Sequence, residues 1–247
     1  MIWINNQKQE EFFDMCIAGG KITTLQDGEV VAWAPARDPQ LKANRVAAHQ
    51  HLYFEGDPRT HIYFIEKGWV KVYRTLIDGQ RQIVGFANAG SVLGLESDDD
   101  HCNTCETVTE VVVRAVPVSR LQDQFLRDPI LADQLLRQIG RQLGAAQAQL
   151  AAVGTQSAEQ KLATFLLTMQ GLSGAEASEE FDLPMRRGDM AEFLGLRLET
   201  ISRKMSDFQR KGWIKMTSLY RCRIVARHVL EELAEGGNPC EMEILAS

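Results

Sequence analysis

The spacing of apolar residues along the chain changes near Pro117 from a strand-like to a helix-like pattern. Between Val46 and Val116 the apolar residues come in short runs separated by turn residues, and Asp78-Gly79 is typical of a two-residue hairpin turn. These runs predict strands over Leu52–Phe54, Ile62–Ile65, Trp69–Arg74, Gln82–Phe86, Val92–Leu95 and Thr107–Val116. Many short strands at close spacing predict a small barrel or jelly roll.

After Pro117 the spacing is that of helices, and Pro129 begins the longest one. Its apolar or small residues recur at alternating gaps of four and three, at Ala132, Leu136, Ile139, Leu143, Ala146, Leu150 and Val153. Such a seam predicts a coiled coil between two copies of the chain. A helix buried against the barrel would show the same stripe, and the residues alone leave both arrangements open.

Two short helices are predicted further on, over Arg187–Leu194 and Leu198–Lys211. Gly195 supplies a residue that tolerates a positive φ between them, and Gly212 ends the second. The apolar residues that fall on their buried sides are Met190, Leu194, Leu196, Ile201, Met205 and Phe208. This is the pattern of a helix-turn-helix, whose second helix enters the DNA major groove.

The segments on either side extend this prediction. Ser157-Ala-Glu-Gln160 has the spacing of a capping box and predicts a helix over Ala158–Met169. Ser173–Glu180 is polar and predicts a linker. The two strands of a wing are predicted at Trp213–Thr217 and Cys222–Val225.

The exposed face at the start of the second helix carries Arg197, Glu199, Ser202 and Arg203. A carboxylate accepts from the cytosine amino group, a guanidinium donates twice to guanine, and a hydroxyl reaches either kind of base edge. The face therefore has the chemistry of a base-reading surface. An ordinary amphipathic helix pair with a solvated charged face is the alternative.

Charge is distributed unevenly along the 247 residues, whose net charge is −6. From Met185 to His228 there are eleven Lys or Arg against four Asp or Glu, a net +7, and the remainder holds 16 against 29, a net −13. The basic region predicts that the surface facing DNA phosphates lies in the C-terminal third of the chain. Basic side chains that neutralise phosphates release counterions from the DNA, and this release contributes affinity for DNA.

Several classes of protein are excluded by what the sequence lacks. There is no apolar run of about 18 residues and no basic, then apolar, N-terminal signal, so we expect a cytoplasmic protein without a membrane partner. Five cysteines, an odd number, argue against a disulfide framework. No Ser-His-Asp order, phosphate loop or His-Glu-x-x-His motif supports an enzyme.

Barrel, seam helix and winged helix-turn-helix in this order resemble the CRP/FNR family of bacterial transcription regulators. Ser157–Leu167 and Arg187–Arg203 are very similar to the FNR and FixK branch, and Asp78–Phe86 resembles FixK. The resemblance implies an α+β fold with a β-roll similar to cyclic-nucleotide-binding domains, a long dimerisation helix and a C-terminal winged helix-turn-helix. The expected parts are an N-terminal extension (1–45), the β-roll (46–118), the connecting and dimerisation helix (119–153), the DNA-binding domain (154–235) and a tail (236–247).

By the same resemblance, the family's reading triplet Glu-x-x-Ser-Arg falls on Glu199, Ser202 and Arg203. The implied function is a homodimeric regulator that binds double-stranded DNA at a palindrome with TTGA-type half-sites, and that contacts RNA polymerase if it is an activator. The expected DNA-binding residues are Arg187, Arg197, Glu199, Thr200, Ser202 and Arg203. Lys204 stands where the family usually has an apolar residue, which predicts looser packing of the reading helix.

The resemblance weakens at the sensing end. The Gly-Glu and Arg-Ser pairs that hold cyclic AMP in some members align with Gly90-Ser91 and about His101-Cys102, so we expect no cyclic AMP site. An FNR-type iron–sulfur cluster needs four cysteines, but only Cys16 lies near the start and the region of Arg114 has no strand cysteine.

Three modes of control then remain open. A small organic effector in the β-roll would meet Tyr73, Arg74, Arg81 and Arg114, although each is also typical of an exposed strand. Cys102 and Cys105, predicted in a loop with His101, have the spacing of a redox pair or of two metal ligands, although a lone Cys-x-x-Cys is often a plain surface loop. The FixK likeness also allows an effector-independent regulator. The sequence identifies no metal or other cofactor with certainty.

Overall fold

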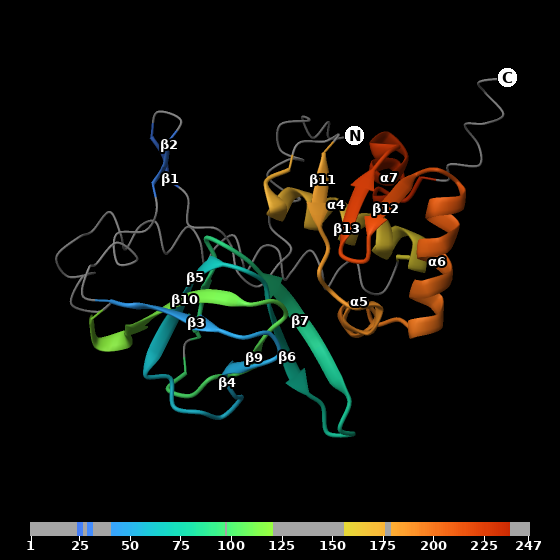
Figure 1. Ribbon diagram of the computed structural model, residues 1–247. Coiled ribbons are helices and arrows are strands. Elements are labelled where there is room, and N and C mark those ends of the chain that lie inside the picture. The colour runs from blue at the N-terminus through green and yellow to red at the C-terminus, as the bar shows by residue number, and fades with distance from the viewer. Residues whose placement is uncertain are drawn as a thin grey trace, which may run out of the picture. The chain divides into compact units, whose positions relative to one another are not determined.

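The computed structural model describes residues 24–26, 29–31, 41–96, 98–120, 156–175 and 179–237. These residues belong to two compact units, one within Ile17–Ala146 and one that includes Gln147–Ser247 (Figure 1). The predicted seam from Ala132 to Val153 lies outside the described residues. Within the described part, no helix has the length and apolar character needed to cross a membrane.

The N-terminal unit is a β-roll of two four-stranded antiparallel sheets (Figure 1). One sheet has the order β3 (Ala43–Val46), β10 (Val111–Pro117), β5 (His61–Lys67) and β8 (Val92–Leu93). The other has the order β4 (His51–Tyr53), β9 (Thr104–Thr107), β6 (Val70–Thr75) and β7 (Arg81–Ala87). A separate hairpin pairs β1 (Thr24–Gln26) with β2 (Glu29–Val31).

Alternation of side chains along the strands builds the core of the roll. In β6, Val70 and Val72 join a buried cluster with Ile65 of β5 and Cys105 of β9. Successive side chains of a strand point to opposite faces, so the intervening Lys71 and Tyr73 belong to the other face of the sheet. Tyr73, one of the predicted effector residues, is on that face.

The predicted single strand Thr107–Val116 is wrong, because the structure has two strands, β9 and β10, separated by residues 108–110. The break is held by Trp69, whose carbonyl accepts from the N–H groups of Val108 (2.7 Å) and Thr109 (3.3 Å). The Thr109 hydroxyl accepts from the Trp69 N–H at 2.9 Å. These bonds come from a segment 40 residues away, and nothing in the local sequence marks the break.

The described residues of the C-terminal unit form four helices and a three-stranded sheet (Figure 1). Its helices are α4 (Ala158–Ser173), α5 (Arg187–Leu194), α6 (Leu198–Arg210) and α7 (Arg227–Ala234). The sheet has the order β11 (Glu180–Asp182), β13 (Arg221–Ile224) and β12 (Ile214–Ser218).

The capping box at the start of α4 is confirmed: the Gln160 N–H donates to the Ser157 hydroxyl at 3.3 Å, and the Ser157 N–H donates to the Gln160 side chain at 2.6 Å. The predicted linker Ser173–Glu180 ends in a strand instead, since β11 begins at Glu180 and pairs with β13. Phe181, the centre of β11, is fully buried. The wing hairpin is therefore completed by a third strand from before the helix-turn-helix.

Candidate nucleic-acid interface

The α5–turn–α6 segment forms as the sequence predicts. α5 ends at Leu194 and Gly195 adopts φ 63°, while α6 ends at Arg210, one residue before the predicted end, and Gly212 adopts φ 73°. α6 is anchored by Ile201, Met205 and Phe208, of which at most 1 % is exposed. Its strongly polar opposite side is left at the surface.

That opposite side presents the predicted reading triplet. Glu199, Ser202 and Arg203 are exposed in the first two turns of α6, and their spacing of three and four places them on one helical face. Among the described residues, the side chains of Glu199 and Arg203 form no hydrogen bond or ion pair, so both groups are available to a ligand. Arg197 is exposed at the N-cap position, and Thr200 is half-buried beside it.

Arg187 lies apart from this triplet. It begins α5, is half-buried and donates from Nη1 to the Met190 sulfur at 3.3 Å. Burial lowers the pKa of its guanidinium, and the neighbouring Cys222 acts in the opposite direction. Cys222 itself is buried in β13, which raises the pKa of its thiol to about 12.

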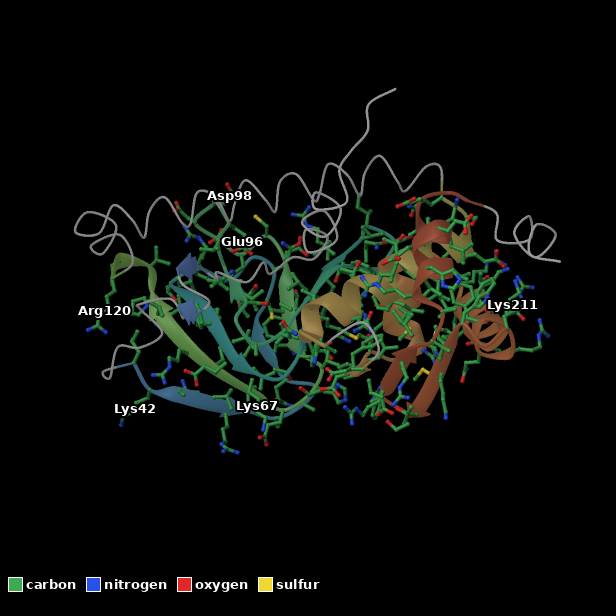
Figure 2. The ribbon with its side chains drawn as sticks, turned by 90° about the horizontal axis from the view of Figure 1, so that it is seen from above. Lys42, Lys67, Glu96, Asp98, Arg120 and Lys211 are labelled. Atoms are coloured by element: carbon green, nitrogen blue, oxygen red, sulfur yellow. The ribbon has the colours of Figure 1, made fainter. Side chains whose placement is uncertain are left out.

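Three further basic side chains of this unit, those of Lys204, Arg210 and Lys211, have acidic or aromatic partners. Arg210 pairs with Asp207 at 2.7 Å, and the Lys211 ammonium lies 4.2 Å from the centre of the Trp213 ring. Lys211 is labelled at the surface of the unit in Figure 2. Lys204 was predicted to loosen the packing of α6, but its ammonium bonds to Glu159 of α4 at 2.6 Å. This partner lies 45 residues away, and its pairing has no signal in the local sequence.

The comparison with known proteins agrees with this geometry. The profile of the Crp-like helix-turn-helix domain matches residues 160–233, and that of the cyclic nucleotide-binding domain matches residues 43–128. The fumarate and nitrate reduction regulatory protein of Yersinia pestis is 30 % identical over 194 residues, which cover 77 % of this chain and 76 % of that protein. The chain belongs to the CRP/FNR family of transcription regulators.

Within this CRP/FNR family the similarity is to the FNR and FixK branch. The nitrogen fixation regulation protein FixK of Rhizobium meliloti is 28 % identical, over 81 % of this chain and 90 % of that protein. The solved structure of FixK2 from Bradyrhizobium japonicum superposes with a TM-score of 0.72 at 31 % identity, covering 78 % of this chain and 98 % of that one. These relatives are regulators and not enzymes, so this chain is a DNA-binding transcription regulator.

In the β-roll of this CRP/FNR regulator, the four predicted effector residues do not meet at one place. Tyr73 and Arg81 lie together, with the guanidinium 5.4 Å from the ring centre. Arg74 donates to the Cys102 carbonyl at 3.0 Å and pairs with Glu55 at 3.7 Å.

Arg114 lies on β10, in the other sheet. Its guanidinium donates to Glu66 and to the Leu41 carbonyl. Of the four predicted effector residues, Tyr73 and Arg81 are the two described residues that form a cation–π contact with each other.

Tyr73 and Arg81 border an ionic cluster that the sequence analysis missed. Its centre is the buried Glu106 carboxylate, which lies 3.3 Å from the Lys71 ammonium and 3.9 Å from Arg81. His49 and His51 approach the same carboxylate at 3.7 and 3.9 Å, and His51 Nε2 is 3.1 Å from the Tyr73 hydroxyl. The alternation of Lys71 and Tyr73 with buried valines in β6 was the available signal. Pairing of β4, β9, β6 and β7 is what brings the groups together.

The two cysteines of the Cys-x-x-Cys motif lie in different environments. Cys105 was predicted in a loop, but it lies in β9 with none of its surface exposed, and burial raises the pKa of its thiol far above the ordinary value. Cys102 is partly exposed and its thiol donates to Asp98 at 3.3 Å, which also raises its pKa. Both thiols are thus protonated at neutral pH. Within the described residues, no three His, Cys, Asp or Glu side chains are grouped as a metal site requires.

His101, the predicted third member of this motif, is part of the wall of the roll. Its ring stacks on Tyr53 with centroids 3.8 Å apart, and Nδ1 lies 3.3 Å from a Glu96 oxygen. Figure 2 places Glu96 and Asp98 at the same edge of the β-roll, away from Lys42 and Lys67. His101 and Cys102 thus each have a carboxylate partner at this edge.

Proposed function

We propose that this regulator binds, as a homodimer, a palindromic DNA site with TTGA-type half-sites, and that the first two turns of α6 read the bases. The observation that carries the proposal is the exposed set Glu199, Ser202 and Arg203 opposite the buried Ile201, Met205 and Phe208. Buried anchors fix the helix, and unpaired polar groups on its other side are free to bond to base edges.

Each group of the triplet has a partner of matching chemistry. The Arg203 guanidinium donates two hydrogen bonds to O6 and N7 of guanine, and the Glu199 carboxylate accepts from the amino group of cytosine. Arg197 and Thr200 lie beside the triplet, and Arg187 begins α5. All three are proposed to contact the phosphate backbone, which contributes affinity without sequence information.

Dimerisation is proposed to occur through residues 119–153, for which the apolar seam of the sequence predicts a helix. Two-fold symmetry then explains a palindromic target, because each protomer presents one α6 to one half-site. The β-roll (46–118) is the sensor, the segment 154–235 binds DNA, and residues 1–45 and 236–247 flank them. An activating regulator of this architecture would also contact RNA polymerase.

Control by a small organic effector other than cyclic AMP is the proposed role of the β-roll. The effector would bind one arrangement of the dimer better than another and so shift the population that is competent for DNA. Effector-independent binding is the alternative that the FixK likeness supports. A thiol switch at Cys102 and Cys105 has less support, because the Cys105 thiol is fully buried and protonated.

The test is fluorescence anisotropy with a labelled palindromic duplex and with the same duplex after transversion of the guanine pair. Arg203→Ala is expected to lose about 1–3 kcal/mol of binding free energy on the palindrome and to discriminate less at that base pair. Arg210→Ala is the matched control. This substitution removes the same charge from the far end of the same helix, where Arg210 is paired with Asp207. If Arg203→Ala discriminates as well as the unmodified protein, the reading face is wrongly assigned.

A further inference from the structure

Lys204 follows Arg203 in α6, but its side chain is directed at the protein. Its ammonium bonds to the Glu159 carboxylate at 2.6 Å, and the two side chains are 22 % and 34 % exposed. Glu159 is the second residue of α4 and lies within the capping box, between Ser157 and Gln160. The bond therefore ties the reading helix to the first turn of α4.

The same turn of α4 also contacts α5. The Lys161 ammonium donates to the carbonyl of Leu194, the last residue of α5, at 3.4 Å. A cation at a helix C-terminus is bonded to one of the carbonyls that have no partner within the helix. The first turn of α4 thus contacts both helices of the helix-turn-helix through charged side chains, Glu159 to α6 and Lys161 to α5.

A directional bond supplies what the apolar anchors of α6 lack. Ile201, Met205 and Phe208 hold the helix against the core, but contacts between apolar side chains are non-directional. Hydrogen bonds to bases weaken steeply when distance or angle is wrong. Because Lys204 is adjacent to Arg203, fixing its ammonium restricts rotation of α6 at the residue that is proposed to read guanine.

We propose that Lys204 is a positioning residue for base recognition and not a phosphate contact, and that Glu159 is its anchor. The inference rests on the proposed reading role of α6. In this role the Lys204–Glu159 pair contributes to discrimination between DNA sequences and contributes little to the general affinity for DNA.

The two roles predict opposite signs at Glu159. If Lys204 bound a phosphate, removing the Glu159 charge would free the ammonium and strengthen binding to any duplex, and Lys204→Met would weaken binding to every duplex. For Lys204→Met, the slope of log affinity against log salt concentration would then fall by the amount of about one phosphate contact per protomer. If Lys204 positions α6, Glu159→Gln and Lys204→Met both weaken binding to the palindrome alone.

The experiment measures the affinity of the full-length protein for a palindromic and a scrambled duplex over a range of salt concentrations. Glu159→Gln and Lys204→Met are each expected to weaken palindrome binding about three- to tenfold, the loss of roughly one ordinary hydrogen bond, because this ion pair is partly exposed. The affinity for the scrambled duplex and the salt dependence of binding should not change. The double variant should lose no more palindrome affinity than either single variant. Lys215→Met, which removes an exposed charge from β12, is the matched control and should leave the ratio of the two affinities unchanged.

The exchanged pair, Glu159→Lys with Lys204→Glu, separates positioning from a folding defect. It restores the bond with the charges reversed and is expected to recover part of the discrimination. Tighter binding by Glu159→Gln, or an equal loss on both duplexes by Lys204→Met, would overturn the inference while the unmodified protein still discriminates. An unmodified protein that does not discriminate would instead refute the proposed function, and the positioning role with it.

Discussion

Two glycines of the β-roll allow the packing at the β5–β6 turn to be tested. Gly68 adopts φ +92°, and a Cβ added there would lie 2.2 Å from the Glu110 carbonyl oxygen and 3.0 Å from the Val111 Cα. Gly79, at the tip of the β6–β7 hairpin, adopts φ +80° with no atom within 4 Å of an added Cβ. The two positions share an unfavourable backbone conformation and differ in available space.

The difference sets the expected magnitudes. A side chain in a positive-φ conformation costs about 1–2 kcal/mol, and this is the whole expected loss for Gly79→Ala. Gly68→Ala adds an overlap with backbone atoms, and overpacking of this kind costs about 1–3 kcal/mol more. The neighbouring backbone cannot move away easily, because Trp69 is bonded to Val108 and Thr109.

Hydrogen–deuterium exchange of peptides from β5 and β10 is the suitable assay, since it reports the stability of the roll separately from the other unit. Exchange of the most protected amides should accelerate about tenfold for each 1.4 kcal/mol lost. The acceleration of exchange in Gly68→Ala should therefore be at least about fivefold greater than in Gly79→Ala. Equal acceleration in the two variants would show that residues 108–110 do not close over Gly68 as described.

Three further predictions concern thiols and a helix cap. Of Cys102, Cys105 and Cys222, only Cys102 should react with iodoacetamide in the native protein at pH 8, as peptide mass spectrometry would show, because the other two are buried. The folded chain holds the Cys222 proton up to about pH 12 while the unfolded chain releases it near 9, so the free energy of unfolding should fall by about 1.4 kcal/mol per pH unit between these values. Urea titrations should find this part of the decline missing in Cys222→Ala. Ser157→Ala should cost about 1 kcal/mol in the same titration and Ser157→Asn much less; equal losses would contradict the capping role.

Local patterns predicted the DNA-binding unit well. The bounds of α5 and α6 follow from Gly195, Gly212 and the apolar spacing between them, and the cap of α4 follows from Ser157 and Gln160. These features depend on residues within a few positions of each other. Interactions between residues so close in the chain can be inferred from a single sequence.

Features that depend on distant segments could not be predicted in the same way. The break between β9 and β10 is imposed by Trp69, and Cys105 is buried because β9 pairs with β6 and β4. Lys204 appeared unfavourable in its helix until α4 supplied Glu159. In each case the deciding partner is far away in the chain, and only the folded topology brings it near.

The effector candidates show the limit most clearly. Tyr73, Arg74, Arg81 and Arg114 were chosen as basic or aromatic strand residues, but side chains of adjacent residues in a strand point to opposite faces. The fold therefore separates Arg74 from Tyr73 and leaves Arg114 in the other sheet. The Glu106 cluster, which draws on β4, β6, β7 and β9, emerges only from the pairing of these strands.

Selection of bound sequences from a pool of randomised duplexes tests the central claim most directly, because it assumes neither the target nor the dimer. The purified protein is expected to enrich a palindrome with TTGA-type half-sites, and Arg203→Ala is expected to enrich the same palindrome with one relaxed position in each half-site. Enrichment of no motif, or of a single unrepeated half-site unaffected by Arg203→Ala, would contradict the claim that paired α6 helices read the bases.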